Sequence, residues 1–317
     1  MQIPNDILKG CWFLAGPTAC GKSEAAIVLA ERIDAEILSM DSMSIYRGMD
    51  VGTAKPSAAQ RAMIPHHLLD LCEPNESFSV AQYLQAADAV ARDVVLRGRV
   101  PLFVGGTGLY LRALLRGVFD GPPIPPELRK QLEADLESSS AEELHERLTR
   151  VDPRAAQRIH AHDGRRIVRA LEVYLATGRP LSEQQRQNVL PPEARPQNVY
   201  WLSAPRGWLY DRIDRRVERM FADGLVDEVR RLLAEPLGLS HTARQALGYK
   251  EVIAHLDLGV PLHETIALIQ TRTRQFAKRQ HTWFRHLDEC RAVEMTGAEA
   301  ATQLAELVLK AARVTAL

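Results

Sequence analysis

The stretch Gly16-Pro17-Thr18-Ala19-Cys20-Gly21-Lys22-Ser23 constrains this chain more than any other part of its sequence. It matches the phosphate-loop pattern, in which two glycines separated by four residues are followed by Lys and then by Ser or Thr. The apolar run 11–15 before it predicts a buried strand, and 24–30 after it predicts a helix. Because the pattern requires a strand before the loop and a helix after it, we interpret the stretch as a phosphate-binding loop rather than a chance glycine-rich turn.

The residue types of this loop suit a diphosphate or triphosphate. Glycines let backbone N–H groups point inward without a Cβ in the way, and the positive end of the following helix favours an anion. Lys22 adds a positive charge, and the hydroxyl of Ser23 is placed to hold Mg²⁺ beside the phosphates. The motif therefore predicts a phosphate ligand, but it leaves open which atom of that ligand reacts.

A chain of 317 residues suits one large domain or two of medium size. Lys plus Arg equal Asp plus Glu at 40 each, so a nucleic-acid site must come from local clustering of positive charge. The cysteines, Cys11, Cys20, Cys72 and Cys290, form no Cys-x-x-Cys pair, which predicts reduced thiols rather than disulfides or a zinc site. No signal peptide or membrane-length apolar run is evident, so we expect a cytoplasmic protein with no membrane contact.

A second predicted strand, 36–40, runs into Asp41. Two strands joined by a helix indicate a parallel sheet, and ligands of such sheets bind beyond the carboxyl ends of the strands. Asp41 is therefore expected beside the phosphate loop, and the glycine-rich segment 43–56 is expected to be a loop over the same face. The pair His66 and His67 has no acidic or cysteine partner at metal-ligand spacing, which favours a structural role.

The next part of the chain predicts an amphipathic helix over 79–97 and a third strand over 100–104. This strand ends in Gly105-Gly106-Thr107-Gly108, which indicates either a close approach of backbone or hydroxyl groups to the ligand or merely a tight turn. A strand-end Asp would be the usual magnesium ligand of an ATPase at this point. Its absence leaves Asp41 as the only evident acid–base candidate.

Two proline clusters, 122–126 and 191–196, flank a region whose pattern is helical throughout. The simplest interpretation is a helical insertion between stiff linkers, after which the strand 199–202 resumes the core. We predict a core domain of residues 1–119 and 197–317 and an inserted helical domain of residues 120–196. The run 165–169 carries three arginines, which fits either a solvated helix face or contacts with phosphates.

The last third of the chain is mostly helical in pattern. Helices are predicted over 208–222, 225–233, from 262 to about 283 and in the tail after Thr296, and 245–250 resembles a helix end with a glycine cap. The segment between Thr271 and Leu287 contains no acidic residue. It favours a nucleic-acid surface over an ordinary solvated face, because it interleaves cations with rings that can stack on bases, namely Arg272, Arg274, Lys278, Arg279, Arg285, Phe276, Trp283 and Phe284.

The residues alone leave two functions open. A phosphate loop, a carboxylate at the neighbouring strand end and a basic region favour a phosphotransferase that uses ATP on a nucleoside or small metabolite. The same features fit a non-catalytic RNA-binding module with an inactive loop.

The chain resembles the bacterial tRNA dimethylallyltransferases, also called the IPP transferase family, in four segments: Gly16–Ser23, Asp41–Pro56, Gly105–Tyr110 and Lys278–Arg285. The resemblance runs through nearly the whole chain, and Asp41–Pro56 is more specific than the phosphate loop. It implies a P-loop NTPase-like α/β core, a parallel sheet flanked by helices, with an inserted all-helical domain. It also implies transfer of a dimethylallyl group from dimethylallyl diphosphate to N6 of adenosine 37, in the tRNA anticodon stem-loop, by a Mg²⁺-dependent enzyme that we expect to be a monomer.

The resemblance also implies roles for individual residues. Asp41 would be the base, and Thr107 and Arg216 would act beside it in catalysis. Gly16, Pro17, Thr18, Ala19, Cys20, Gly21, Lys22 and Ser23 would bind the diphosphate, with Ser23 at the metal; Cys20 stands where Ser is common and Ser23 where Thr is common. The segments that would contact tRNA contain Asp41, Ser42, Met43, Ser44, Thr107, Arg165, Arg166, Ile167, Val168, Arg169, Gln245, Ala246, Leu247, Gly248, Tyr249, Lys250, Lys278, Arg279, Gln280, His281, Thr282, Trp283, Phe284 and Arg285.

Overall fold

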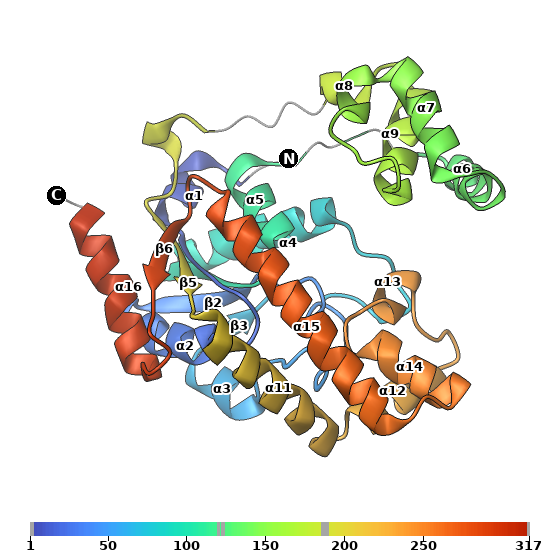
Figure 1. The fold of residues 1–317 in the computed structure, drawn as a ribbon. Coiled ribbons are helices and arrows are strands. Elements are labelled where there is room, and N and C mark those ends of the chain that lie inside the picture. The colour runs from blue at the N-terminus through green and yellow to red at the C-terminus, as the bar shows by residue number, and fades with distance from the viewer. Residues whose placement is uncertain (1–2, 119–120, 122–123, 185–189, 316–317) are drawn as a thin grey trace. The chain divides into compact units, whose positions relative to one another are not determined.

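The structure, a computed structural model, describes residues 3–118, 121, 124–184 and 190–315 (Figure 1). The chain forms two compact units. The larger unit consists of the segments before residue 116 and after residue 189, and the smaller unit spans 116–189. The sequence-based division places its boundaries at 119/120 and 196/197.

A six-stranded sheet forms the centre of the larger unit, and every pair of neighbouring strands is parallel. The strand order is β3-β2-β4-β1-β5-β6. This confirms the predicted α/β core with a parallel sheet (Figure 1). The bounds are β1 Trp12–Ala15, β2 Ala35–Ser39, β3 His66–His67, β4 Val100–Gly105, β5 Asn198–Ser203 and β6 Arg291–Glu294.

Alternating side chains of the strands give the sheet an apolar layer on each face. Leu14, Leu102 and Leu202 belong to the cluster that buries α2 and α16, two helices that pack against each other. On the other face the ring of Phe13 stacks on Phe103, with centroids 5.0 Å apart. The helices of this unit are α1 Asn5–Gly10, α2 Lys22–Ile33, α3 Ala58–Met63, α4 Val80–Leu96, α5 Gly108–Arg116, α11 Arg206–Ala222, α12 Leu225–Ala234, α13 His241–Arg244, α14 Tyr249–Leu258, α15 Leu262–Arg285 and α16 Ala301–Thr315, with a 3₁₀ turn at Pro192–Ala194.

Two predicted helix ends lie elsewhere in the structure. The segment 245–250 does follow a helix end, because Gln245 is the C-cap of α13, but Gly248, with φ of +92°, is the N-cap of α14, so the expectation that this glycine caps a helix end is wrong. The tail helix begins at Ala301 rather than at Thr296, because Glu299 accepts hydrogen bonds from the N–H groups of Thr296 and Gly297 and holds a turn there.

The described part of the smaller unit is helical, with α6 Pro126–Ser138, α7 Ala141–Val151, α8 Pro153–Ala156, α9 Gly164–Thr177 and α10 Leu181–Gln184. Its own apolar core contains Leu148, Ile167 and Leu171. The buried carboxylate of Asp152 caps α8 through the N–H of Ala155 and also accepts from the N–H of Ser182. Since α8 ends at Ala156 and α9 begins only at Gly164, residues 157–163 interrupt the region that the sequence pattern predicts to be helical throughout.

Among the described residues, no helix combines the length and the apolar character needed to cross a bilayer.

Candidate active site

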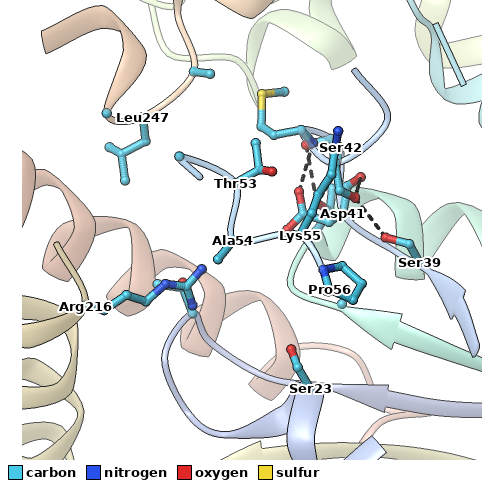
Figure 2. Close-up of a pocket in the computed structure, with 18 of the residues that line it drawn as sticks. Ser23, Ser39, Asp41, Ser42, Thr53, Ala54, Lys55, Pro56, Arg216 and Leu247 are labelled. Carbon is cyan, nitrogen blue, oxygen red and sulfur yellow. Dashed lines mark hydrogen bonds between the residues drawn. The ribbon is translucent and has the colours of Figure 1, made fainter. Parts of the chain in front are cut away.

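A cavity of about 410 Å³ opens beyond the carboxyl ends of the central strands, within the larger unit. Its wall is formed by the phosphate loop, the loops after β2 and β4, and helices α11 and α15, among others. Figure 2 shows Ser23, Asp41 and Arg216 around this space, each from a different part of the chain. Of the residues predicted for the site, the cavity wall contains Thr18, Lys22, Ser23, Asp41, Ser42, Met43, Ser44, Thr107, Arg216, Gln245, Ala246, Leu247, Gly248, Tyr249, Arg279 and Gln280.

The phosphate loop joins β1 to α2 through two residues with left-handed backbone, Ala19 at φ 65° and Gly21 at φ 89°. Lys22 opens the helix, and its ammonium group donates to the carbonyl of Pro17 at 3.2 Å. Burial raises the pKa of the Cys20 thiol, so this residue is a neutral packing group rather than a reactive thiolate. The loop thus presents a helix N-terminus, a lysine and the hydroxyl of Ser23 to one cavity.

Asp41 lies two residues beyond the end of β2 and belongs to a short hydrogen-bonded turn. Its Oδ1 accepts from the N–H of Met43 at 2.8 Å, and its carbonyl accepts from the hydroxyl of Ser44 at 3.2 Å. Ser44 also shares a 2.9 Å hydrogen bond with Ser39, the last residue of β2 (Figure 2). These contacts hold the carboxylate in place while Oδ2 has no hydrogen-bond partner among the described residues.

Thr107 connects the end of β4 to the Asp41 turn. Its Oγ1 accepts from the N–H of Ser42 at 3.0 Å, and its own N–H donates to the carbonyl of Met40 at 3.2 Å. Gly105 is required beside this connection, because a Cβ there would overlap the backbone of Met40. Gly105, at the end of β4, therefore lets the ends of β2 and β4 approach each other and lets Thr107 reach the cavity. The glycine-rich segment does more than form a tight turn.

Arg216 projects from α11 into the cavity (Figure 2). It makes no hydrogen bond or ion pair with another described residue, whereas Arg212, one turn earlier, donates to the carbonyl of Ala19 at 2.8 Å. Burial lowers the pKa of the Arg216 guanidinium below its ordinary value, although the nearby carboxylates of Asp41 and Glu24 act in the opposite direction. A partly buried cation that forms no ion pair with another described residue, next to a phosphate loop, is suited to bind a phosphate group.

The predicted RNA segment of α15 has two different sides. Lys278, Arg279, Thr282 and Arg285 are exposed, whereas Gln280 and Phe284 are buried. The Gln280 carboxamide bonds to Thr18 and Gly106. The ring of Trp283 covers Gly108, where a Cβ would approach it to 2.9 Å, and carries Arg112 at 5.1 Å from its centroid.

The carboxylate of Glu228, which no sequence pattern indicates, holds the loop 43–56 by its backbone. Glu228 of α12 is buried and accepts from the N–H groups of Asp50, Val51 and Gly52 at 2.8–3.1 Å. Lys55 anchors the other end of the loop, with its ammonium group 2.8 Å from Asp50 and 2.6 Å from Asp70. Neither the role of Glu228 nor that of Lys55 can be predicted from charge or helical pattern. The partners of Glu228 lie far away in the sequence, and Lys55 lies in an irregular loop.

The arginine run of α9 belongs to the smaller unit. Ile167 and Val168 are buried in that unit's core, so their side chains do not reach its surface. Arg166 pairs with Asp163 and Arg169 with Glu172, each at 3.3 Å. Arg165 is exposed and has no ion pair among the described residues.

The two adjacent histidines have ordinary hydrogen-bond partners. Nδ1 of His66 lies 2.7 Å from the carbonyl of Ile64, and Nε2 of His67 lies 2.6 Å from Glu36. Within the described residues, no group of three or more His, Cys, Asp or Glu side chains is arranged to hold a metal ion.

Comparison with known sequences gives a consistent family. The model of the IPP transferases matches residues 44–287. A tRNA dimethylallyltransferase 1 of Trichlorobacter lovleyi is 48% identical over 272 residues, 86% of this chain and 89% of that protein. A tRNA dimethylallyltransferase of Geobacter metallireducens is 46% identical over 282 residues, 89% of this chain and 91% of that protein.

Solved structures agree with the sequence comparison. The full-length tRNA isopentenylpyrophosphate transferase of Bacillus halodurans superposes with a TM-score of 0.70 and 37% identity, over 97% of each chain. A eukaryotic dimethylallyltransferase acting on tRNA gives a TM-score of 0.73 and 26% identity, over 90% of this chain and 74% of that one. Since the family model covers most of the sequence and the relatives align along most of their length, the chain belongs to the IPP transferase family.

Proposed function

We propose that this chain is a tRNA dimethylallyltransferase that moves the dimethylallyl group of dimethylallyl diphosphate to N6 of adenosine 37, next to the anticodon, and releases diphosphate. The family and the names of the relatives support the transferase activity. The observation that carries the proposal is the cavity shared by three groups: the phosphate loop, Asp41, and Arg216, which forms no ion pair within the part of the chain that the structure describes.

The diphosphate end of the donor fits the phosphate-loop side of the cavity. The C1–O bond of the donor breaks as a bond from N6 to C1 forms, so negative charge develops on the departing diphosphate. Lys22, Arg216 and the N–H groups at the start of α2 are arranged to stabilise that charge. The phosphate loop thus holds a leaving group on carbon rather than a phosphoryl group in transfer.

The adenine amine needs a base because its lone pair is delocalised into the ring. Asp41 is fixed by its turn at one oxygen, and its second oxygen is available to accept the N6 proton as the new bond forms. Thr107 holds this turn through Ser42 and lines the same space. The target base is stacked in the anticodon loop, so it must be extruded to reach a carbon centre inside the cavity.

Magnesium fits the residues on this side of the cavity. Mg²⁺ prefers oxygen ligands and keeps several waters, so a single protein hydroxyl beside a diphosphate is a suitable site. Ser23 supplies that hydroxyl at the cavity wall, and no metal-binding cluster of carboxylates or imidazoles competes for the ion within the described residues. Bound there, Mg²⁺ would neutralise part of the diphosphate charge.

For the tRNA we propose contacts on the exposed face of α15 and on the smaller unit. Lys278, Arg279 and Arg285 carry positive charge on that face of α15, and Arg165 is exposed on α9. Such cations contact the RNA backbone and make binding depend on salt concentration. We also propose that the enzyme acts as a monomer in the cytoplasm, where its substrate is found.

The test is a transfer assay with two donors. The protein is incubated with Mg²⁺, an anticodon stem-loop and labelled dimethylallyl diphosphate, and in parallel with labelled ATP. We expect label from the prenyl donor in a stem-loop with adenosine at position 37 and none in a matched stem-loop with guanosine there. Label that moves only from ATP would establish a phosphotransferase, and RNA binding without turnover of either donor would establish a binding module.

A further inference from the structure

Gln280 differs from its neighbours on α15 because it turns away from the exposed basic side. The residue is 4% exposed, whereas Lys278 and Arg279 are exposed and Arg279 also borders the cavity. A polar side chain at such a buried position must satisfy its hydrogen-bonding groups inside the protein. Its partners therefore indicate what it does.

Both ends of the Gln280 carboxamide are used, and each contacts a different loop of the site. Oε1 accepts from the backbone N–H of Thr18 in the phosphate loop at 2.9 Å. Nε2 donates to the carbonyl of Gly106, in the loop after β4, at 2.8 Å. A carboxamide offers an acceptor and a donor at once, which a carboxylate or an apolar side chain of similar length does not. Gln280 thus joins the RNA-facing helix to the two loops that form the donor side of the cavity.

Close packing around this contact leaves α15 little freedom to move relative to the two loops. A Cβ on Gly106 would collide with Nε2 of Gln280, and it would also approach the carbonyl of Gly16 to 3.3 Å. In the same part of α15, Ala277 and Phe284 are buried to 1% and 0% exposure. A displacement of this segment of the helix therefore has to move the two loops with it or break buried hydrogen bonds, which is costly.

We infer that Gln280 is a positioning residue that couples tRNA binding on the exposed side of α15 to donor binding in the phosphate loop. The inference rests on the proposed function, because it needs RNA on α15 and a diphosphate in the loop. Contacts between RNA and Lys278 or Arg279 fix the helix, and the carboxamide transmits that position to Thr18 and Gly106. By linkage, a diphosphate in the loop strengthens RNA binding by the same factor as RNA strengthens diphosphate binding.

The experiment measures that factor directly. The dissociation constant of an anticodon stem-loop is determined with and without saturating inorganic diphosphate and Mg²⁺, for the native protein, Gln280→Glu, Gln280→Met and the matched control Gln303→Glu on α16. We expect the native protein and the control to bind RNA about fivefold or more tightly with diphosphate. In both Gln280 variants the ratio of the RNA dissociation constant without diphosphate to that with diphosphate should approach one. KM for the donor should rise more than kcat falls.

Two variants are needed because a carboxylate facing the Gly106 carbonyl is repulsive, whereas Met keeps the length without charge. Melting temperatures identify a variant that fails to fold, and the other one then decides. A ratio equal to the native one in either folded Gln280 variant overturns the coupling, as does a native protein whose RNA affinity ignores diphosphate. These results are distinct from failure of the proposed function, in which the native protein transfers no dimethylallyl group at all.

Discussion

The hydroxyl of Tyr249 donates to Oε1 of Glu228 at 2.5 Å, and both residues are buried. Burial and the neighbouring carboxylate raise the pKa of Tyr249, so the phenol remains a donor. The same carboxylate accepts from three consecutive backbone N–H groups of the loop 50–52. One side chain of α12 thereby holds two cavity-lining segments together, the loop after β2 and the start of α14.

We predict that Glu228→Gln lowers the free energy of unfolding by roughly 1.5–3 kcal/mol, the usual worth of hydrogen bonds to a charged group. The amide brings an N–H₂ group toward donors that need an acceptor. Urea unfolding of the variant measures this loss, and Tyr249→Phe, which removes only one of the donors, should lose about 1 kcal/mol. Equal stability of the native protein and Glu228→Gln would refute the anchor.

Asp41→Asn should separate chemistry from folding at the active site. The Asn side-chain oxygen can still accept from Met43, so the turn is kept, but the amide cannot take the N6 proton. We expect kcat to fall by about 10²- to 10⁴-fold with tRNA affinity largely unchanged, as for loss of a general base. Asp41→Ala, which loses the turn as well, should abolish transfer. Single-turnover kinetics measure the step, and near-native turnover of Asp41→Asn would remove this residue as the base.

Arg216→Gln should weaken the use of the donor. The guanidinium has no partner among the described residues, so its removal costs the diphosphate a charge-assisted contact of about 1.5–3 kcal/mol. We expect kcat/KM for dimethylallyl diphosphate to fall by about 10- to 100-fold. Arg215→Gln, one position away and exposed on the same helix, is the control. The assignment fails if the two variants behave alike.

Arg279→Ala should make tRNA binding weaker and less sensitive to salt. A lost phosphate contact reduces the slope of log K against log salt by about one. Binding of the stem-loop between low and physiological salt measures the slope. Arg313→Ala on α16, an exposed arginine outside the proposed RNA surface, should leave it unaltered. An unchanged slope for Arg279→Ala would contradict a phosphate contact there.

Glu36 provides a pH test of the core. Burial raises the pKa of its carboxyl, but hydrogen bonds and charge from Arg97 and His67 lower it more, so the net pKa lies below the ordinary 4.5. A pKa that is depressed on folding stabilises the protein above about pH 4.5, and this contribution is lost as the pH falls further. We expect Glu36→Gln to cost about 1–2 kcal/mol at pH 7, because Arg97 is partly exposed. The difference in urea unfolding should shrink at pH 4, and a constant difference would exclude the ionised pair as its cause.

The strands and most helices were predictable because their signals are local. Hydrophobic runs indicate β1, β2, β4 and β5, and Ser79 caps α4 through a reciprocal pair with Gln82. β3 and β6 carry too few apolar residues for such a signal; they form because they pair with β2 and β5. A glycine with positive φ fits either end of a helix, and only the structure shows that the helix lies on the C-terminal side of Gly248.

The candidate site was predictable only in part. Motifs indicated the phosphate loop, Asp41 and Thr107, since strand ends of a parallel sheet converge. The contacts that hold these groups could not be read from the sequence: Gln280 lies 262 positions from Thr18, and Glu228 lies 178 positions from Asp50. Buried polar residues with distant partners have no periodicity to reveal them.

The close packing between the loop after β4 and α15 restricts how this enzyme can be re-engineered. The missing side chains at Gly106 and Gly108 leave room that Gln280 and Trp283 occupy. The four positions therefore have to change as one set, because a larger residue on either side displaces its counterpart. A chimera that takes α15 from a distant relative should work only when residues 105–108 are transplanted with it.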